Sequence, residues 1–211
     1  MAGGRGAAPT DRREVILREA AELFARQGVA ATTVREIADA AGILSGSLYH
    51  HFASKDDIVD AVLSTFLTEL RERYDEVLTG AGDAPGRLRG LIVASLETVA
   101  AHPRATEIYQ NDAHRLRADN GYPYVEESAK AVRAAWVGVL EEGRASGAFR
   151  DDVPLKVTYP LLRDGLWLTA RWFRPTKSYG HQELAADYWR IFLGGLTGTA
   201  PAAARPGPSA A

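Results

Sequence analysis

Apolar residues recur every three or four positions along almost the whole chain, and this spacing limits the fold more than any other feature. One stripe near the start consists of Ile16, Ala20 and Leu23, with Phe24 beside it. A period near 3.6 residues is that of an amphipathic helix, and no stretch of useful length alternates as a strand does. Apolar residues make up 46% of the chain, which is enough for a packed core. The sequence therefore predicts an all-α fold.

Capping signals and glycines divide the first sixty residues into short helices. A serine or threonine followed three positions later by an acidic residue caps a helix N-terminus, and glycine ends a helix because it accepts a positive φ. These signals are Thr33 with Glu36, Ser54 with Asp57, Gly28 and Gly42. They predict three helices, the third over about residues 45–51, and then a long helix from about residue 55. This is a helix-turn-helix arrangement.

Five further helices complete the predicted fold, which has about nine helices in all. Their expected ranges are 88–101, 104–118, 123–146, 154–174 and 181–197. Pro160 should kink the fourth of these or delay its start, and Pro154 suits a first turn capped by Asp152. We expect four parts: a disordered arm (1–9), a helix-turn-helix domain (10–56), a larger helical domain (57–199) and a disordered tail (200–211).

Charge and composition exclude several classes of protein. Without cysteine, the chain has no disulfide, thiol nucleophile or thiolate metal site. It shows no signal-peptide pattern and no run of about 18 apolar residues, so we expect a cytoplasmic protein without a membrane span. The net charge is −2, and residues 1–60 hold seven basic and nine acidic side chains. Any contact with DNA must therefore depend on local geometry rather than on bulk charge.

The segment LSGSLYHHFASKDD, residues 44–57, holds side chains that suit either catalysis or DNA binding. His50 and His51 are adjacent and point to different helix faces, so they lack the four-residue spacing of a metal-binding pair. A Ser–His nucleophilic pair needs a third orienting group, and none is evident. We therefore expect no metal, no cofactor and no enzyme activity. A role for Tyr49 in the core stays open beside a role at DNA.

The longer run TTVREIADAAGILSGSLYHHFASKDDIVDAV, residues 32–62, resembles the TetR family of transcriptional repressors. The resemblance implies a homodimer that binds a palindromic operator through its third helix and responds to a small effector. It makes residues 10–56 the DNA-binding domain and residues 57–199 the ligand-binding and dimerisation domain. Small hydroxyl-bearing residues on that helix suit base edges, and residues beside helix N-termini suit phosphates. The expected DNA-binding residues are Thr33, Ser45, Gly46, Ser47, Tyr49, His50, His51 and Lys55. Leu44 departs from the family, which often has a serine or threonine cap there.

A second stretch, RDGLWLTARWFRP at residues 163–175, predicts a ligand site. Arg163, Trp167 and Arg171 follow one another at four-residue spacing and so share one helix face. Two guanidiniums flanking an indole suit an anionic ligand with a flat or apolar body. Asp164 lies about 100° round the helix from Arg163, so we expect it not to neutralise that arginine.

The same arginines allow a structural alternative, in which they pair with Glu183 or Asp187 at a helix interface. The stretch, together with IYQNDAHRL at residues 108–116, is similar to a branch of the family that regulates the late, ring-opening steps of cholesterol catabolism. That resemblance implies a coenzyme A (CoA) thioester of a sterol remnant as the effector. Further candidates for the pocket are Tyr109, Asn111, Asp112 and Trp136.

The last predicted helix suits a dimer interface. Leu184, Tyr188 and Ile191 lie on one face, and Gly194 and Gly195 allow close approach. With the preceding helix it would form the four-helix interface that the family resemblance implies. One rival class is a helical acyl-CoA-binding enzyme or carrier, which would need a positioned base. The candidate bases form no constellation in the sequence: His102, His114 and His181.

Overall fold

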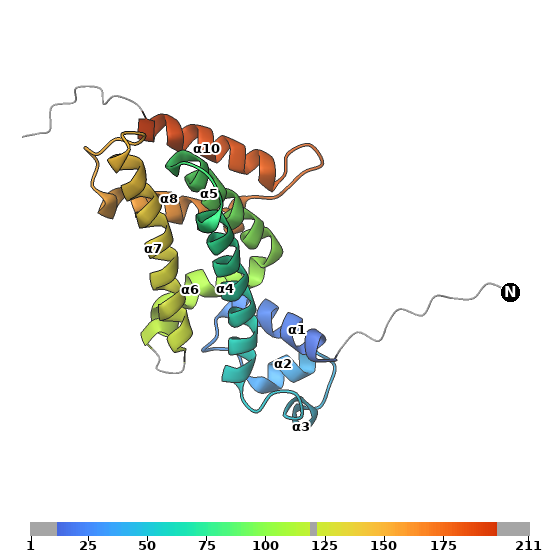
Figure 1. Ribbon diagram of the computed structural model, residues 1–211. Coiled ribbons are helices and arrows are strands. Elements are labelled where there is room, and N and C mark those ends of the chain that lie inside the picture. Colours follow the sequence, from blue (N-terminus) through green and yellow to red (C-terminus); the bar gives the residue numbers. More distant parts are fainter. Residues whose placement is uncertain (1–11, 119–121, 198–211) are drawn as a thin grey trace, which may run out of the picture.

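The computed structural model describes residues 12–118 and 122–197, and every regular element within them is an α-helix. The helices are α1 (Arg12–Gln27), α2 (Val34–Ala40), α3 (Ser45–Leu48), α4 (Lys55–Thr79), α5 (Ala84–Ala101), α6 (Pro103–Ala118), α7 (Pro123–Ala145), α8 (Leu155–Trp167), α9 (Thr169–Trp172) and α10 (His181–Thr197). The first three lie at one end of the molecule and α10 at the other (Figure 1). The all-α prediction is confirmed, while the predicted arm (1–9) and tail (200–211) lie outside the described residues.

The first three helices and the start of α4 enclose the core of the helix-turn-helix unit. Each of these elements contributes fully buried apolar side chains: Ile16, Phe24, Ile37, Leu48 and Ile58. α4 then continues as one helix of 25 residues into the rest of the molecule. The expected division between residues 56 and 57 therefore falls within the first turn of a continuous helix.

Both predicted capping boxes form. Thr33 Oγ1 accepts a hydrogen bond from Glu36 N, and the Glu36 carboxylate accepts one from Thr33 N at 2.7 Å. Ser54 and Asp57 bond in the same reciprocal way at the start of α4. These bonds satisfy donors that a helix N-terminus leaves unpaired. Gly28 has a φ of +84°, which lets the chain turn sharply after α1.

The third helix is shorter than predicted. It ends at Leu48, and residues 49–51 form turns instead of a further helical turn. Leu44 occupies the N-cap position and provides no side-chain hydrogen bond, in agreement with the sequence. One helical turn without a side-chain cap has little stability of its own, so the burial of Leu48 must hold it in place.

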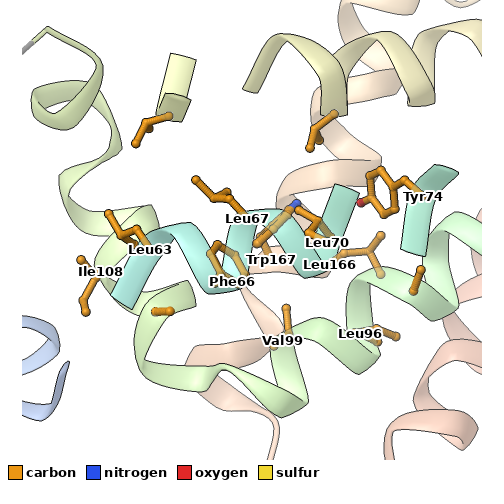
Figure 2. Close-up of a cluster of buried hydrophobic side chains, with 14 of the residues drawn as sticks. Leu63, Phe66, Leu67, Leu70, Tyr74, Leu96, Val99, Ile108, Leu166 and Trp167 are labelled. Carbon is orange, nitrogen blue, oxygen red and sulfur yellow. The ribbon is translucent and has the colours of Figure 1, made fainter. Parts of the chain in front are cut away.

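α4 runs from the helix-turn-helix core into a larger core shared with α5, α6, α7 and α8 (Figure 1). Its buried face carries apolar side chains along most of its length (Figure 2): Leu63, Phe66, Leu67, Leu70 and Tyr74. Trp167 of α8 packs into the same cluster, with its ring edge-on to Phe66 at 5.7 Å between centroids. The buried side chains of the helix-turn-helix unit and of the larger core form one cluster, and α4 contributes to both parts of it.

The predicted 154–174 helix is interrupted, although not where its proline stands. α8 begins at residue 155 despite Pro160, which lies in its second turn and removes a single backbone hydrogen bond. The interruption comes at Leu168, after which α9 adds one more turn. Pro154 takes the N-cap position rather than the first turn, and Asp152 forms an ion pair instead of capping the helix. The expected delay at the proline and the expected aspartate cap were therefore wrong.

No helix within the described ranges is long and apolar enough to cross a bilayer. Large apolar side chains of α8, α9 and α10 nevertheless reach the surface. Leu161 of α8 is 61% exposed, Trp172 of α9 is 61% exposed and Ile191 of α10 is 71% exposed. Exposed apolar side chains of this size mark a contact surface where they lie together.

Candidate DNA-binding face and ligand cavity

α3 and the turn after it lie at one end of the molecule, open to solvent (Figure 1). Tyr49 is 54% exposed, so it is not a core residue as the structural alternative required. The other DNA-binding candidates of this segment are exposed or half-buried: Ser45, Gly46, Ser47, His50 and His51. The structure therefore presents six of the eight candidates on one short surface segment.

The two remaining candidates, Lys55 and Thr33, support the scaffold beside α3. Lys55 Nζ donates to the carbonyl oxygens of Val29 at 2.8 Å and Thr32 at 2.9 Å. Backbone and side-chain hydrogen bonds from Thr33 lower the pKa of the Glu36 carboxyl. An ammonium has three donors, so Lys55 retains one beyond these two bonds. Lys55 thus ties the start of α4 to the turn between α1 and α2.

A cavity of about 430 Å³ lies between α6, α7, α8 and α9. Its size is in the range of small-molecule sites. Four of the seven residues that the sequence suggests for the ligand site line it: Tyr109, Arg163, Trp167 and Arg171. The polar and aromatic lining residues that the sequence did not suggest are Gln110, Glu126, Lys130, Arg133 and Tyr159.

Positive charge exceeds negative charge in this cavity, because four cationic side chains line it against two carboxylates. The guanidiniums of Arg133 and Arg163 both lie over the Tyr159 ring, each 5.3 Å from its centroid. An aromatic face attracts a cation without cancelling its charge. No ion pair joins Arg133 to a carboxylate of the described residues. The cavity is therefore suited to an anion.

Asp164 overturns one expectation about this charge. Nε and Nη2 of Arg163 lie 2.7 Å and 2.6 Å from Asp164 Oδ1. Neighbouring side chains leave a helix about 100° apart, but an arginine is long enough to reach back to its neighbour. The expectation that Asp164 leaves Arg163 unneutralised was therefore wrong. Both side chains are more than one-third exposed, so this ion pair adds little stability. Its effect is to reduce the positive charge that Arg163 brings to the cavity.

Trp167 forms an aromatic wall of the cavity and is only 6% exposed. The rings of Tyr109 and Phe66 approach it with centroids at 5.9 Å and 5.7 Å. Gln110 Nε2 donates to the Trp167 carbonyl oxygen, and this fixes the amide orientation because a carbonyl can only accept. Gln110 Oε1 and Trp167 Nε1 are then buried without a partner among the described residues. A bound ligand is a natural partner for such groups.

Arg171 binds α6 and not α10. Its Nη2 donates to Asn111 Oδ1 at 2.6 Å. Glu183 and Asp187 instead form their hydrogen bonds within residues 179–190. Within the described ranges, the alternative in which the cavity arginines pair with these two carboxylates is therefore not observed.

Trp136 lies outside the cavity, so its assignment to the pocket was wrong. Its side chain is fully buried, and its Nε1 donates to Tyr74 Oη at 3.0 Å. Burial raises the pKa of Tyr74 to about 12, which keeps this hydroxyl protonated. The face of α7 that carries Trp136 packs against α4, and an adjacent face reaches the cavity. Asp112, another pocket candidate, accepts from Val29 N on the side of the helix-turn-helix unit.

The histidines considered as catalytic bases have structural contacts. His102 Nε2 lies 2.6 Å from Glu69 Oε2, and the His181 ring packs edge-on against Phe173 at 5.0 Å. Neither histidine lines the cavity. The side chain of His114 is outside the described part of the structure.

The spacing of the sequence could have identified one more residue of the cavity. Tyr159 precedes Arg163 by four residues and so extends the stripe of Arg163 and Trp167 backwards. Arg133 stands three residues before Trp136, on a neighbouring face of the same helix. Nothing in the sequence places Arg133 over Tyr159, because that contact joins two helices.

Two family models match the chain and together cover most of it. The family described as "Bacterial regulatory proteins, tetR family" matches residues 16–62. That range holds most of α1, all of α2 and α3, and the start of α4. The family described as "Tetracyclin repressor-like, C-terminal domain" matches residues 81–196, which hold every residue that lines the cavity.

Curated relatives and solved structures agree with these matches. The HTH-type transcriptional repressor KstR2 of Mycobacterium tuberculosis is 44% identical over 186 residues, 88% of this chain and 93% of that protein. KstR2 of Rhodococcus jostii is 43% identical over 185 residues, 88% and 91% of the two chains. A structure of the "ketosteroid transcriptional regulator KstR2" of M. tuberculosis has a TM-score of 0.84 at 42% identity, covering 92% and 100% of the two chains. The chain therefore belongs to the tetR family, as a DNA-binding transcriptional repressor and not an enzyme.

Proposed function

We propose that this repressor binds a palindromic operator as a homodimer and that an anionic effector, a CoA thioester from sterol ring breakdown, releases it. The observation that carries the proposal is the positively charged cavity with its aromatic wall. Guanidiniums suit phosphates, and aromatic side chains suit an adenine or a fused ring system. The description of a relative as a ketosteroid regulator supports the sterol part of the effector.

The polar groups of the cavity suit two parts of an effector, one anionic and one neutral. Arg133 and Arg163, both supported by Tyr159, are the charged anchors. Gln110 Oε1 and Trp167 Nε1 suit neutral groups such as an amide or a hydroxyl, since one accepts and the other donates. A buried polar group without a partner costs about 1–3 kcal/mol, so a ligand that satisfies both atoms is favoured over one that satisfies neither.

At the opposite end of the molecule, α3 is the proposed reader of the major groove. We assign contacts with base edges to Ser45, Gly46 and Ser47. The proposed phosphate contacts come from side chains after and beside this helix: Thr33, Tyr49, His50, His51 and Lys55. Two such helices in a dimer read half-sites about one DNA turn apart, roughly 34–36 Å.

The exposed apolar side chains of α8 and α10 are the proposed dimer interface. Leu161 and Ile191 expose most of their surface in a single chain. Covering this surface with a second copy removes it from water and brings four helices together. Since its target is bacterial DNA, the proposed place of action is the cytoplasm.

Release of operator DNA tests the proposed effector. A duplex selected by the wild-type protein from a random pool is titrated with three probes: CoA, the CoA thioester of a saturated bicyclic carboxylic acid, and the free acid. We expect the thioester to act at the lowest concentration. Arg163→Met should raise that concentration about 10- to 100-fold, because a charge-assisted bond is lost.

The matched control for this titration is Arg89→Met. Arg89 is an exposed arginine of α5 that does not line the cavity, so its variant should respond as the wild type does. If Arg163→Met and the wild type release the duplex at the same thioester concentration, the effector binds elsewhere. If the free acid acts as well as the thioester, the CoA part of the proposal is wrong.

A further inference from the structure

Leu44 has the highest exposure of the large apolar side chains that the structure describes, with 80% of its surface open to solvent. It occupies the N-cap position of α3, yet its side chain makes no capping hydrogen bond. Its neighbour Ile43 packs against the core, and Leu48 is fully buried. A single exposed leucine is common on protein surfaces, but this one stands at the proposed DNA-reading helix. Neither capping nor core packing accounts for a leucine there.

The backbone on both sides holds Leu44 at a fixed place. Its carbonyl oxygen accepts from Ser47 N at 2.9 Å and from Leu48 N at 3.3 Å, which joins it to α3. Ile43 N donates to the Ala38 carbonyl oxygen at 3.0 Å, which joins the preceding residue to the end of α2. The backbone of Leu44 is extended, with φ −71° and ψ 144°, so its side chain leaves the buried face that Leu48 occupies. The exposed leucine is thus held beside α3, at the end of the molecule (Figure 1).

The side chains of this segment limit which bases it can recognise. A recognition helix brings its leading residues to the base edges of the major groove. Residues 41–49 hold no charged side chain, so they cannot form the arginine or lysine contact with guanine that is the commonest specific contact. They offer the hydroxyl groups of Ser45 and Ser47 and the apolar side chain of Leu44. The apolar group that a base presents in this groove is the C5 methyl group of thymine, so the segment is suited to thymine.

We infer that Leu44 reads a thymine in each operator half-site by packing against its C5 methyl group; this rests on the proposed role of α3 as the reader of the major groove. The contact removes two apolar surfaces from water at once. Cytosine lacks the methyl group, and the purines present polar atoms to the groove instead. Leu44 is therefore a specificity-determining residue, and it adds one base position to those assigned to Ser45, Gly46 and Ser47.

Replacing thymine by deoxyuridine tests this contact, because deoxyuridine pairs as thymidine does and lacks only the C5 methyl group. Every thymine of the duplex that the wild-type protein selects is replaced in turn, and affinity is measured by fluorescence anisotropy. At one thymine per half-site, each replacement should weaken wild-type binding about fourfold, as expected for one methyl group that leaves an apolar contact. Leu44→Ala should bind the original duplex about 10- to 20-fold more weakly, because both half-sites lose the contact. It should no longer distinguish thymine from uracil at that position.

Three further variants separate a contact with thymine from other roles of Leu44. Leu44→Met keeps an apolar side chain of similar volume, so it should retain the preference for thymine over uracil. Leu44→Ser supplies the missing cap of α3 but should lose this preference, as Leu44→Ala does. Tyr49→Ala should bind every duplex more weakly and still keep the preference, because its proposed contact is with phosphate. Leu44→Ala and Leu44→Met should unfold at the urea concentration of the wild type, because the side chain is exposed.

The results decide between a thymine contact and its alternatives. If the wild type binds every uracil duplex as tightly as the original, or if Leu44→Ala weakens thymine and uracil duplexes by the same factor, Leu44 does not read thymine. A changed slope of log K against log salt in Leu44→Ala also contradicts the contact, because a methyl group releases no counterions. The proposed function fails in a different way. A selected duplex without a palindrome, or no release by any CoA probe, contradicts that proposal, while the comparison of thymine with uracil still decides the role of Leu44.

Discussion

Asp164 forms an ion pair with Arg163 and would therefore compete with the proposed anionic effector for this arginine. The two side chains lie 2.6 Å apart at their closest atoms, whereas Arg133 lies over the Tyr159 ring and forms no ion pair among the described residues. Asp164→Asn removes the negative charge with little change of shape. We expect the affinity for the CoA thioester to rise about three- to fivefold, as measured by calorimetric titration at low salt. Asp75→Asn, an exposed acid outside the cavity, is the control, and an equal gain in both variants would point to a long-range charge effect.

Lys55 has a structural role as well as a proposed role at DNA. Lys55→Met removes two hydrogen bonds to the carbonyl oxygens of Val29 and Thr32. The free energy of unfolding without DNA should therefore fall by about 1–3 kcal/mol in urea denaturation. The slope of log K for DNA against log salt should also decrease by about one contact. Tyr49→Ala, at an exposed position, should weaken DNA binding with little loss of stability; equal stability of both variants would leave Lys55 as a DNA contact only.

Among the helices, the beginnings that carry a capping box followed from the sequence. Thr33 and Ser54 cap α2 and α4 as predicted, because a capping box is a local interaction between residues three positions apart. The early end of α3 at Leu48 and the break at Leu168 carry no comparable local signal. Such ends depend on how a helix packs against others, which one sequence does not reveal.

The contact between α8 and α10 is close enough to be tested with a single methyl group. A Cβ added at Gly165 would lie 2.6 Å from Tyr188 Oη, and that hydroxyl donates to the Leu162 carbonyl oxygen at 2.5 Å. The hydroxyl cannot retreat without losing this bond. Gly165→Ala should therefore lower the free energy of unfolding by about 1–3 kcal/mol in urea denaturation.

The control for this variant is Gly138→Ala in α7. Apart from its chain neighbours and the backbone of its own helix, no atom of the described residues lies within 4 Å of the position that its Cβ would take. Alanine is favoured over glycine in a helix interior by about 0.5–1 kcal/mol, so Gly138→Ala should stabilise the protein. A stabilising effect of Gly165→Ala as well would contradict a tight contact between α8 and α10.

For the whole molecule, the exposed apolar surface predicts how the chain assembles. Leu161→Glu and Ile191→Glu each place a charge in the proposed dimer interface. We expect a monomer in sedimentation velocity and an affinity for the full palindrome that falls toward that for a half-site, because linked binding is lost. Ala131→Glu, on the exposed side of α7, should remain dimeric. Intact dimers of both interface variants would place the interface elsewhere.

The residues that line the cavity could be predicted from a single sequence only in part. Arg163 and Trp167 followed from spacing, because the period of one helix is written in consecutive residues. Arg133 and Gln110 did not, because they reach the cavity from two other helices. Trp136 was misplaced for the same reason: periodicity locates an inward face but not which helices meet there.

The two guanidiniums over Tyr159 also make effector release of the proposed repressor depend on the salt concentration in the cell. The ring does not neutralise Arg133, and Asp164 moderates only the charge of Arg163, so the cavity attracts the proposed anionic effector by charge and dissolved ions screen that attraction. Binding to the operator is screened as well, because it releases counterions from DNA. A rise in salt therefore lowers both the affinity for operator DNA and the affinity for the effector that releases it. We expect these losses to offset each other, so that osmotic stress alone changes the level of repression less than it changes either affinity.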